Sequence, residues 1–226
     1  MIVIECFPGL VGVMALAMPL ILDDAARGAA YALPCLSGPV TMTHWYTADT
    51  HFGHENIIPN ARRPFRDGEH MAAVLIERLW DRVGPEDDLW IIGDFAFGPK
   101  AKDEGWLLGI FSQLPGARRH LLVGNHDSTL TKGLPWDSVS LLAEVDDPAA
   151  DRPVTLCHYP MITWNHARKG ALHLFGHVHG NWRGSTNAVN VGVDVWDYYP
   201  VSLREAAAHA KTLPQNRHWK DVEPRG

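Results

Sequence analysis

The sequence predicts an α/β fold, and two patterns indicate this class. Short apolar runs typical of buried strands alternate, within residues 43–226, with segments that carry apolar residues at helical spacing. Several of these runs stop at a glycine or a polar residue, as strands do where they lead into functional loops. The composition, 46% hydrophobic and 20% charged over 226 residues, is that of a chain able to bury a core. We therefore expect one α/β domain at 43–226.

The individual elements follow from local patterns. Six segments have the composition of strands: 44–47, 89–92, 120–123, 154–157, 172–175 and 188–195. Apolar residues at helical spacing predict helices over 69–83 and 106–114, the second ended by Pro115-Gly116. Ser202 with Glu205 three residues later forms a capping box, so a last helix is expected from there to about Lys211.

Residues 1–42 differ from the rest and are treated as an apolar N-terminal extension. None of the 13 histidines or nine tryptophans lies in them. The uncharged stretch Cys6–Leu22 is 17 residues long and contains two prolines and two glycines, whereas a membrane span needs about 20 apolar residues. The start also lacks the basic residues of a signal peptide. The alternatives are a mis-assigned start, with Met42 as the true one, an ordered or poorly ordered extension, and export or anchoring.

Charge and cysteine content restrict the setting. The net charge of −6 gives no general attraction to nucleic acid or anionic membrane. Three widely spaced cysteines do not make a disulfide framework, so a cytoplasmic location is expected, with export through residues 1–42 as the alternative. No membrane partner is expected, and the oligomeric state is not predicted.

Five successive apolar runs end in a residue that can bind a metal ion: Asp49, Asp94, Asn125, His158 and His177. Ligands of open α/β sheets bind beyond the carboxyl ends of the strands, so these side chains are expected to converge there.

Two more histidines extend this set. His51 lies two residues after Asp49, and His179 lies two residues after His177 between glycines. Each motif alone has an ordinary explanation, a polar turn or a core histidine. Together they supply three Asp or Asn oxygens and four imidazoles without a thiolate, which suits Mn²⁺, Fe, Zn²⁺ or Ni²⁺ rather than Ca²⁺. Seven ligands are too many for one tetrahedral ion, so we expect two ions, bridged by a carboxylate.

The whole set resembles the signature of calcineurin-like metallophosphoesterases, in a compact bacterial and phage branch, over residues 43 to about 203. The matching motifs are Asp49-x-His51, Gly93-Asp94, Gly124-Asn125-His126-Asp127, His158, Gly176-His177-x-His179 and Asn190-x-Gly192-x-Asp194. The resemblance implies a four-layer α-β-β-α sandwich of two mixed sheets. It also implies a first metal held by Asp49, His51 and His179, a second held by Asn125, His158 and His177, and Asp94 as the bridge.

The same resemblance predicts the activity. A dinuclear centre, with Mn²⁺ the expected metal, would hydrolyse a phosphodiester or nucleotide phosphoester by in-line attack of a metal-bridging hydroxide. His126 would assist as the active-site histidine, Asp127 would orient His126 or a ligand histidine, and His54 would reach the phosphate. The alternatives are a nuclease acting on DNA or RNA ends, and a non-catalytic metal-bound binding module.

Four residues are candidates for contact with the small phosphoester or nucleotide substrate. Arg62 and Arg63 belong to a local basic cluster, and a guanidinium binds phosphate in a bidentate manner. Trp164 and Arg168 lie between His158 and His177, on a loop that could cover the site. Solvated arginines and a packed tryptophan are the alternative interpretation of these four.

Overall fold

The computed structural model describes residues 42–223, so nearly all of the predicted N-terminal extension, residues 1–41, lies outside the described residues. The first of two sheets has the strand order β10-β1-β2-β3-β4. Its strands are β10 (Val201–Ser202), β1 (His44–Thr47), β2 (Asp88–Ile92), β3 (Arg118–Leu122) and β4 (Ser138–Ser140). Strands β1 to β4 are parallel, and β10 is antiparallel to β1.

The second sheet has the order β5-β6-β7-β9-β8. Its strands are β5 (Leu142–Val145), β6 (Val154–Cys157), β7 (His173–Phe175), β9 (Ala188–Asn190) and β8 (Gly184–Ser185). The three central strands are parallel and the two edge strands are antiparallel to their neighbours. Both sheets are therefore mixed, as predicted.

The predicted strand at 188–195 is wrong in its second half. After β9 the Asn190 carboxamide accepts a hydrogen bond from the Gly192 N–H, and the Val193 N–H donates to the Ala48 carbonyl across to the first sheet. These two bonds bend the chain, and Val193–Val195 forms a 3₁₀ turn instead of strand.

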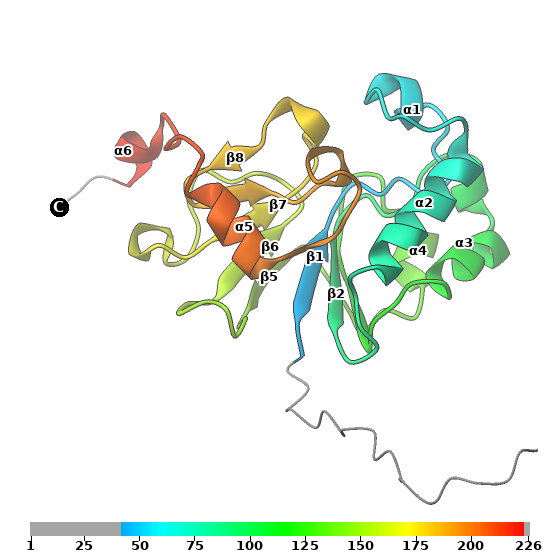
Figure 1. Ribbon diagram of the computed structural model, residues 1–226, viewed down its shortest axis with the longest axis horizontal. Helices are drawn as coiled ribbons and strands as arrows, with labels where there is room; N and C mark the ends of the chain where they lie inside the picture. Colours follow the sequence, from blue (N-terminus) through cyan, green and yellow to red (C-terminus); the bar gives the residue numbers. More distant parts are fainter. Residues whose placement is uncertain (1–41, 224–226) are drawn as a thin grey trace, which may run out of the picture. The chain divides into compact units, whose positions relative to one another are not determined.

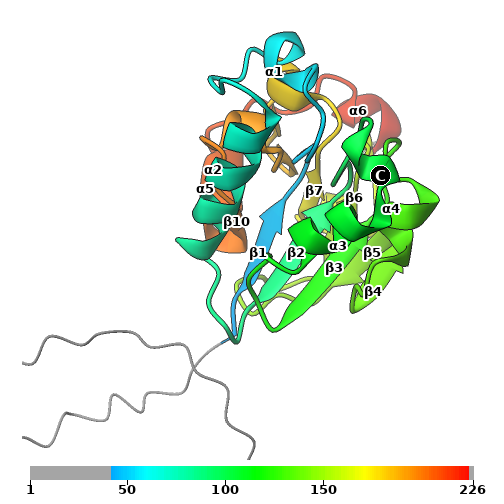
Figure 2. The same cartoon turned by 90° about the vertical axis from the view of Figure 1, so that its right-hand side faces the viewer.

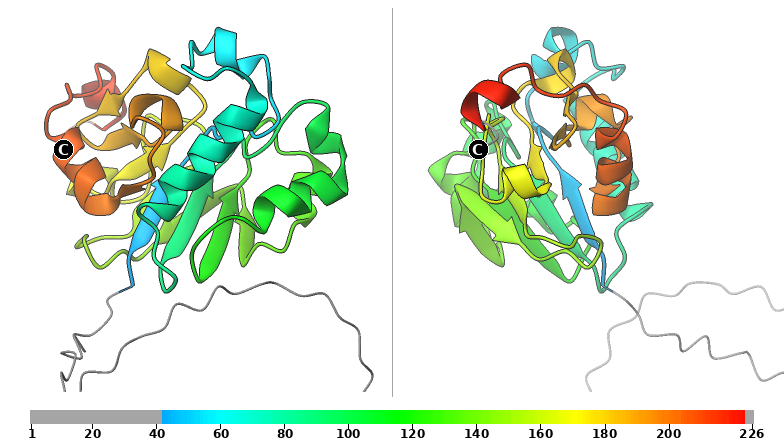
Figure 3. Two further views of the ribbon diagram at one scale, coloured as in Figure 1. Left: turned by 45° about the vertical axis from the view of Figure 1, so that its right-hand side comes forward. Right: turned by 90° about the vertical axis from the view of Figure 1, so that its left-hand side faces the viewer.

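Helices cover the outer face of the first sheet. They are α2 (Gly68–Trp80), α3 (Glu104–Phe111) and α4 (Thr129–Gly133), whereas α1 (Ile57–Asn60) lies beyond the carboxyl ends of the strands (Figure 1 and Figure 2). Asp67 and Asp103 cap α2 and α3 by accepting backbone N–H groups of their first turns. In Figure 1 this helical layer lies to the right of β1 and β2, and the left panel of Figure 3 shows α2 and α3 over the strands. A buried apolar cluster fills the space between them.

A second buried cluster lies between the two sheets. It contains Tyr46 and Ile92 from the first sheet and Leu156, Leu174 and Val189 from the second. Helix α5 (Leu203–Ala210) packs its apolar side against the same cluster. The predicted capping box at Ser202 and Glu205 is present, with both reciprocal hydrogen bonds formed. Helix α5 also contacts β10, and Figure 2 shows the two side by side.

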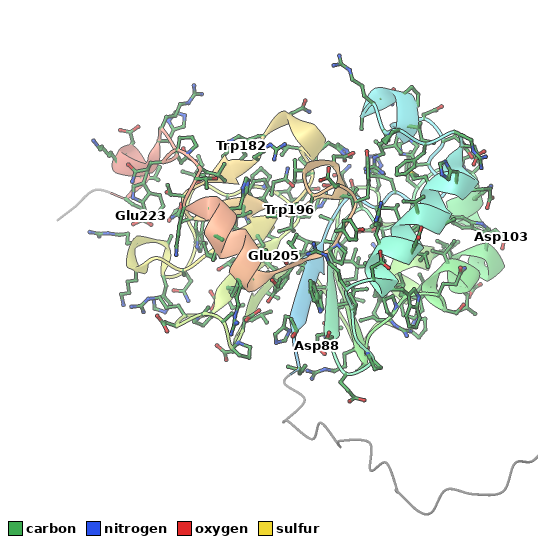
Figure 4. All side chains as sticks on the ribbon, viewed as in Figure 1. Asp88, Asp103, Trp182, Trp196, Glu205 and Glu223 are labelled. Atoms are coloured by element: carbon green, nitrogen blue, oxygen red, sulfur yellow. The ribbon has the colours of Figure 1, made fainter. Side chains whose placement is uncertain are left out.

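The outer face of the second sheet is covered chiefly by aromatic side chains from loops. Trp164 packs on His173, and Trp182 stacks on Phe175 with ring centroids 5.1 Å apart. Trp182 is labelled in Figure 4. The four-residue helix α6 (Trp219–Val222) adds Trp219 beside Trp164. The structure is thus an α/β sandwich of two mixed sheets, with loops and one short helix where a fourth layer was expected.

The carboxyl ends of the central strands of both sheets meet at one edge of the sandwich. Asp49 after β1 donates its N–H to the Gly93 carbonyl after β2, and Gly176 after β7 donates to the carbonyl of His158 after β6. Ala48 forms an isolated bridge with Gly192, which joins the ends of the two sheets. This edge carries the predicted ligands.

Candidate metal centre

One group of three predicted ligands consists of Asp49, His51 and His179, whose ligand atoms lie within 4.8 Å of one another. The Asp49 carboxylate is buried, and its Oδ1 accepts the His177 N–H. Its Oδ2 and the Nε2 of His51 have no hydrogen-bond partner among residues 42–223. Buried polar atoms nearly always have a hydrogen-bond partner. Two atoms of the same group that lack one and can both coordinate a metal therefore indicate a position for a cation.

A second group consists of Asp94, His158 and His177, again within 4.8 Å. Asn125 joins it, because its Oδ1 lies 2.9 Å from the Nδ1 of His177 and 3.2 Å from the Nε2 of His158. The His158 Nδ1 faces the Ile92 carbonyl at 2.9 Å, which fixes the imidazole so that Nε2 points into the group.

Asp94, a member of the second group, also reaches the first. Its Oδ2 is 3.5 Å from the Nε2 of His51 and 3.5 Å from the Nε2 of His158. Its Oδ1 accepts the His126 N–H. Burial alone would raise the pKa of Asp94, but its contacts with His158, the His126 N–H and His51 lower it to about 2. The carboxylate is therefore ionised, and its Oδ2 is equally far from His51 of the first group and His158 of the second.

The turns that carry these side chains have an unusual backbone. Nine non-glycine residues among 42–223 have a positive φ, and five of them are predicted ligands: Asp49, His51, Asp94, His177 and His179. Such a conformation is rare outside glycine and is characteristic of functional sites. The glycines of the motifs provide the space, since a Cβ at Gly124 would lie 2.3 Å from Asp94 Oδ1 and one at Gly176 would lie 2.7 Å from Asp49 Oδ2.

The electrostatics favour cation binding. Burial raises the pKa of Asp49 to about 6, more than the neighbouring imidazoles and the His177 N–H offset. Burial also lowers the pKa of His51 to about 2, so its ring is neutral, the form that binds metal. Carboxylate, carboxamide and imidazole donors without sulfur fit a hard or borderline divalent ion. The residues present therefore fit two such ions.

His126 and His54 border this centre. The half-buried ring of His126 lies 5.3 Å from that of His51 and 4.2 Å from that of Phe97. The Nδ1 of His54 is 3.2 Å from the Nδ1 of His51. Both histidines line a cleft of about 690 Å³, together with His51 and His179. A substrate in this cleft would lie against the candidate ligands.

Asp127 does not orient a histidine, which corrects the prediction. Its buried carboxylate accepts the N–H groups of Asp94, Phe95 and Gly124 at 2.8–2.9 Å. Asp127 therefore ties the turn after β3 to the turn after β2.

Arg63 is likewise not available to a substrate. Its guanidinium is fully buried and makes two 2.8 Å hydrogen bonds to the Asp194 carboxylate, and further bonds to the Asp49 and Thr50 carbonyls. Asp194 Oδ2 also lies 2.8 Å from the Nδ1 of His179. No role was predicted for Asp194, although it belongs to the motif Asn190-x-Gly192-x-Asp194. Its carboxylate orients the His179 imidazole by contact with one ring nitrogen, and the other ring nitrogen of His179 is then the candidate metal ligand.

Of the remaining substrate-binding candidates, one lies at the cleft and two lie away from it. Arg62 lines the cleft. Trp164 donates its indole N–H to the Ala171 carbonyl and packs on His173, and Arg168 pairs with Glu223 next to α6. The covering role predicted for Trp164 and Arg168 is therefore wrong, because both are held on the outer face of the second sheet.

Fold and site together define an α/β sandwich protein with a candidate dinuclear metal centre. The chain is 30% identical to the Gene 66 protein of Mycobacterium phage D29, over 70% of this chain and 91% of the phage protein, and it belongs to the family of that protein. It is 28% identical to an uncharacterized protein of Methanocaldococcus jannaschii, over 69% of this chain and 84% of that protein.

Among solved structures, the chain is similar to a protein of unknown function from Aquifex aeolicus, with a TM-score of 0.58 and 29% identity, over 73% of this chain and 97% of that one. No protein-family model matches the chain. Within residues 42–223, no helix combines the length and the apolarity needed to cross a membrane.

Proposed function

We propose that the protein is a dinuclear metal-dependent phosphoesterase of the calcineurin-like metallophosphoesterase superfamily, acting on phosphodiesters or nucleotide phosphoesters. One observation carries the proposal. The Asp94 carboxylate oxygen is 3.5 Å from a nitrogen of each of two adjacent ligand groups, as a bridge between two ions requires. The superfamily also implies two mixed sheets in a sandwich, and the present fold agrees with that expectation.

The chain's own residues would divide the work as follows. Asp49, His51 and His179 would hold one ion, and Asn125, His158 and His177 the other, with Asp94 shared. When bound, such a pair supplies a nucleophile at neutral pH and positive charge opposite the phosphate oxygens.

His126 would act on the substrate itself. Its N–H is held by Asp94, which fixes the backbone, while the ring lies toward the cleft beside Phe97. From there it can donate a hydrogen bond to a phosphate oxygen or a proton to the leaving oxygen. Mn²⁺ is the proposed metal, with Fe, Zn²⁺ or Ni²⁺ as alternatives of the same donor preference.

The test uses metal-stripped protein with Mn²⁺ added back. Hydrolysis of bis-p-nitrophenyl phosphate and p-nitrophenyl phosphate is followed, and bound metal is counted by elemental analysis. We expect Mn²⁺-dependent turnover, two ions per chain, and loss of both turnover and at least one ion in Asp94→Asn. Asp81→Asn, on the surface after α2, is the matched control and should behave as wild type.

Two results would contradict the proposal. Turnover that survives both chelation and Asp94→Asn would show that the hydrolysis does not depend on this centre. Two bound ions with no hydrolysis of either ester, with Mn²⁺ and then with Fe²⁺, Zn²⁺ or Ni²⁺ added back in its place, would favour the binding module.

A further inference from the structure

Two adjacent arginines have opposite environments. Arg63 is fully buried, with its donors occupied by Asp194 and by carbonyls of the Asp49 loop. Arg62 is exposed and is one of the residues that line the cleft beside His51, His126 and His179. Arg63 therefore fastens this loop to the metal centre, while Arg62 faces the space in front of it.

The guanidinium of Arg62 has no acidic partner among residues 42–223. No salt bridge or side-chain hydrogen bond is formed by Arg62 within the part of the chain described, and none of the cleft's lining residues is Asp or Glu. Asn60 and Asn181, both exposed and on the same cleft, add two carboxamides whose hydrogen-bonding groups are also unused among residues 42–223. A guanidinium with flanking amides is a recognition set for phosphate oxygens.

The turn at Arg62 ends helix α1. Arg62 has a φ of 55°, the left-handed conformation that commonly follows the C-cap of a helix, here Ala61. Here the Arg63 N–H, bonded to the Ile58 carbonyl, and the Arg63 side chain hold the turn.

The cleft is larger than one phosphate needs. Its volume of about 690 Å³ is in the range of small-molecule sites, and it extends from the ligand histidines to α1. A phosphate at the metal pair would leave the Arg62 end of the cleft open to another part of the same substrate.

We propose that Arg62, with Asn60 and Asn181, forms a second anion site, so that the substrate carries a phosphate group in addition to the one that is hydrolysed. This rests on the proposed function, because the metal pair is taken as the position of the scissile phosphate. The substrate class is then a bisphosphorylated nucleotide or a short nucleotide chain, and not a simple monoester.

The experiment compares two ligands that differ by one phosphate. Mn²⁺-loaded protein is titrated calorimetrically with thymidine 3′,5′-bisphosphate and with thymidine 5′-monophosphate. In parallel, kcat/KM is measured for the 5′-p-nitrophenyl phosphate ester of thymidine with and without a 3′-phosphate. We expect about tenfold preference for the extra phosphate in both assays, as one charge-assisted interaction provides.

Variants locate the preference. Arg62→Ala should remove it, and Arg62→Lys should retain part of it, since lysine keeps the charge without the planar fork. Arg66→Ala removes a nearby exposed arginine outside the lining of this cleft and should leave the preference unchanged. Thermal unfolding and metal content should match wild type in all three.

The outcomes separate this proposal from the proposed function. Equal binding of the two nucleotides by wild type, or an Arg62→Ala preference equal to wild type, would overturn the anion site while ester hydrolysis stands. An equal loss on both esters would also overturn it, because Arg62 would then act on the scissile phosphate. A preserved binding preference without hydrolysis of either ester would support the anion site and refute the esterase.

Discussion

The most informative perturbation is Asp194→Asn, because it leaves every predicted ligand in place. Asp194 accepts two hydrogen bonds from the buried Arg63 guanidinium and faces the His179 Nδ1, all at 2.8 Å. Burial alone would raise the pKa of Asp194, but these contacts more than offset it and hold the pKa below its usual value. The residue is therefore an anion that balances Arg63 and orients His179.

The structure sets the size of the effect. Arg63 has no exposed side-chain surface and Asp194 only 5%, so solvent does not screen their pairing. Removing the charge of one partner of a buried pair costs about 3–5 kcal/mol, and Asn, which retains part of the hydrogen bonding, should fall near 3 kcal/mol. Loss of a carboxylate behind a ligand histidine weakens metal binding by about 10- to 100-fold.

The assay is performed with metal-stripped protein. Urea unfolding gives the stability change without metal, and titration with Mn²⁺ at limiting free concentration gives the two affinities. We expect the weaker affinity at one ion only, the one assigned to His179. Asp197→Asn, an exposed carboxylate three residues further on, is the control. Unchanged affinity at both ions in a folded Asp194→Asn protein would refute the orienting role.

Three further predictions follow from the site and its surroundings. His126→Ala should keep both ions and lose about 10²–10⁴ in turnover, and unchanged rates with both good and poor leaving groups would contradict its role. Asp127→Asn should lower the free energy of unfolding by about 1–3 kcal/mol in urea, because the amide group cannot accept all three backbone N–H groups, whereas an unchanged stability would show that these bonds are dispensable. Burial lowers the pKa of His173 from 6.5 to about 4. As the pH falls, the His173 imidazole is protonated in the unfolded chain before it is protonated in the folded protein. The contribution of His173 to the free energy of unfolding is therefore complete above pH 6.5 and is lost as pH falls toward 4, by about 2 kcal/mol at pH 5. In His173→Gln this part of the decrease in the free energy of unfolding between pH 7.5 and pH 5 should be absent, as measured on the metal-free proteins. An equal decrease in the variant and the wild type would contradict the assignment to His173.

The sequence predicted the strands that lead into the site well. Buried parallel strands are continuous apolar runs, so β1, β2 and β6 are recognisable without tertiary information. The edge strands β4, β5, β8 and β10 were not predicted. Val139, Leu141 and Leu142 are exposed in the edge region, where pairing with a neighbour and not a local pattern makes the chain extended.

The roles of charged residues were harder to predict than the ligands. Arg62 and Arg63 are adjacent and chemically identical, and only the turn geometry sends one into the core and the other to the cleft. Asp194 is 131 residues from Arg63, a separation that no local pattern bridges. Ligands can be read from motifs because the chemistry restricts their type, whereas the partners that orient them depend on packing.

The left-handed backbone of the ligand turns links the fold to the proposed metal site. Five residues with this backbone conformation in one small region would destabilise an isolated segment by several kcal/mol, because local contacts do not offset the strain. Here hydrogen bonds between strand ends fix these turns: from Asp49 to Gly93, from His51 to Asp94, from His177 to Asp49, and from Asp94 to Asp127 in the turn after β3. A sandwich whose two sheets are joined at this edge can hold these conformations before any ion binds. The ligand geometry should therefore survive metal removal, with a chelator lowering thermal stability only by the lost binding free energy, about 2.7 kcal/mol at a hundredfold excess of metal over its dissociation constant.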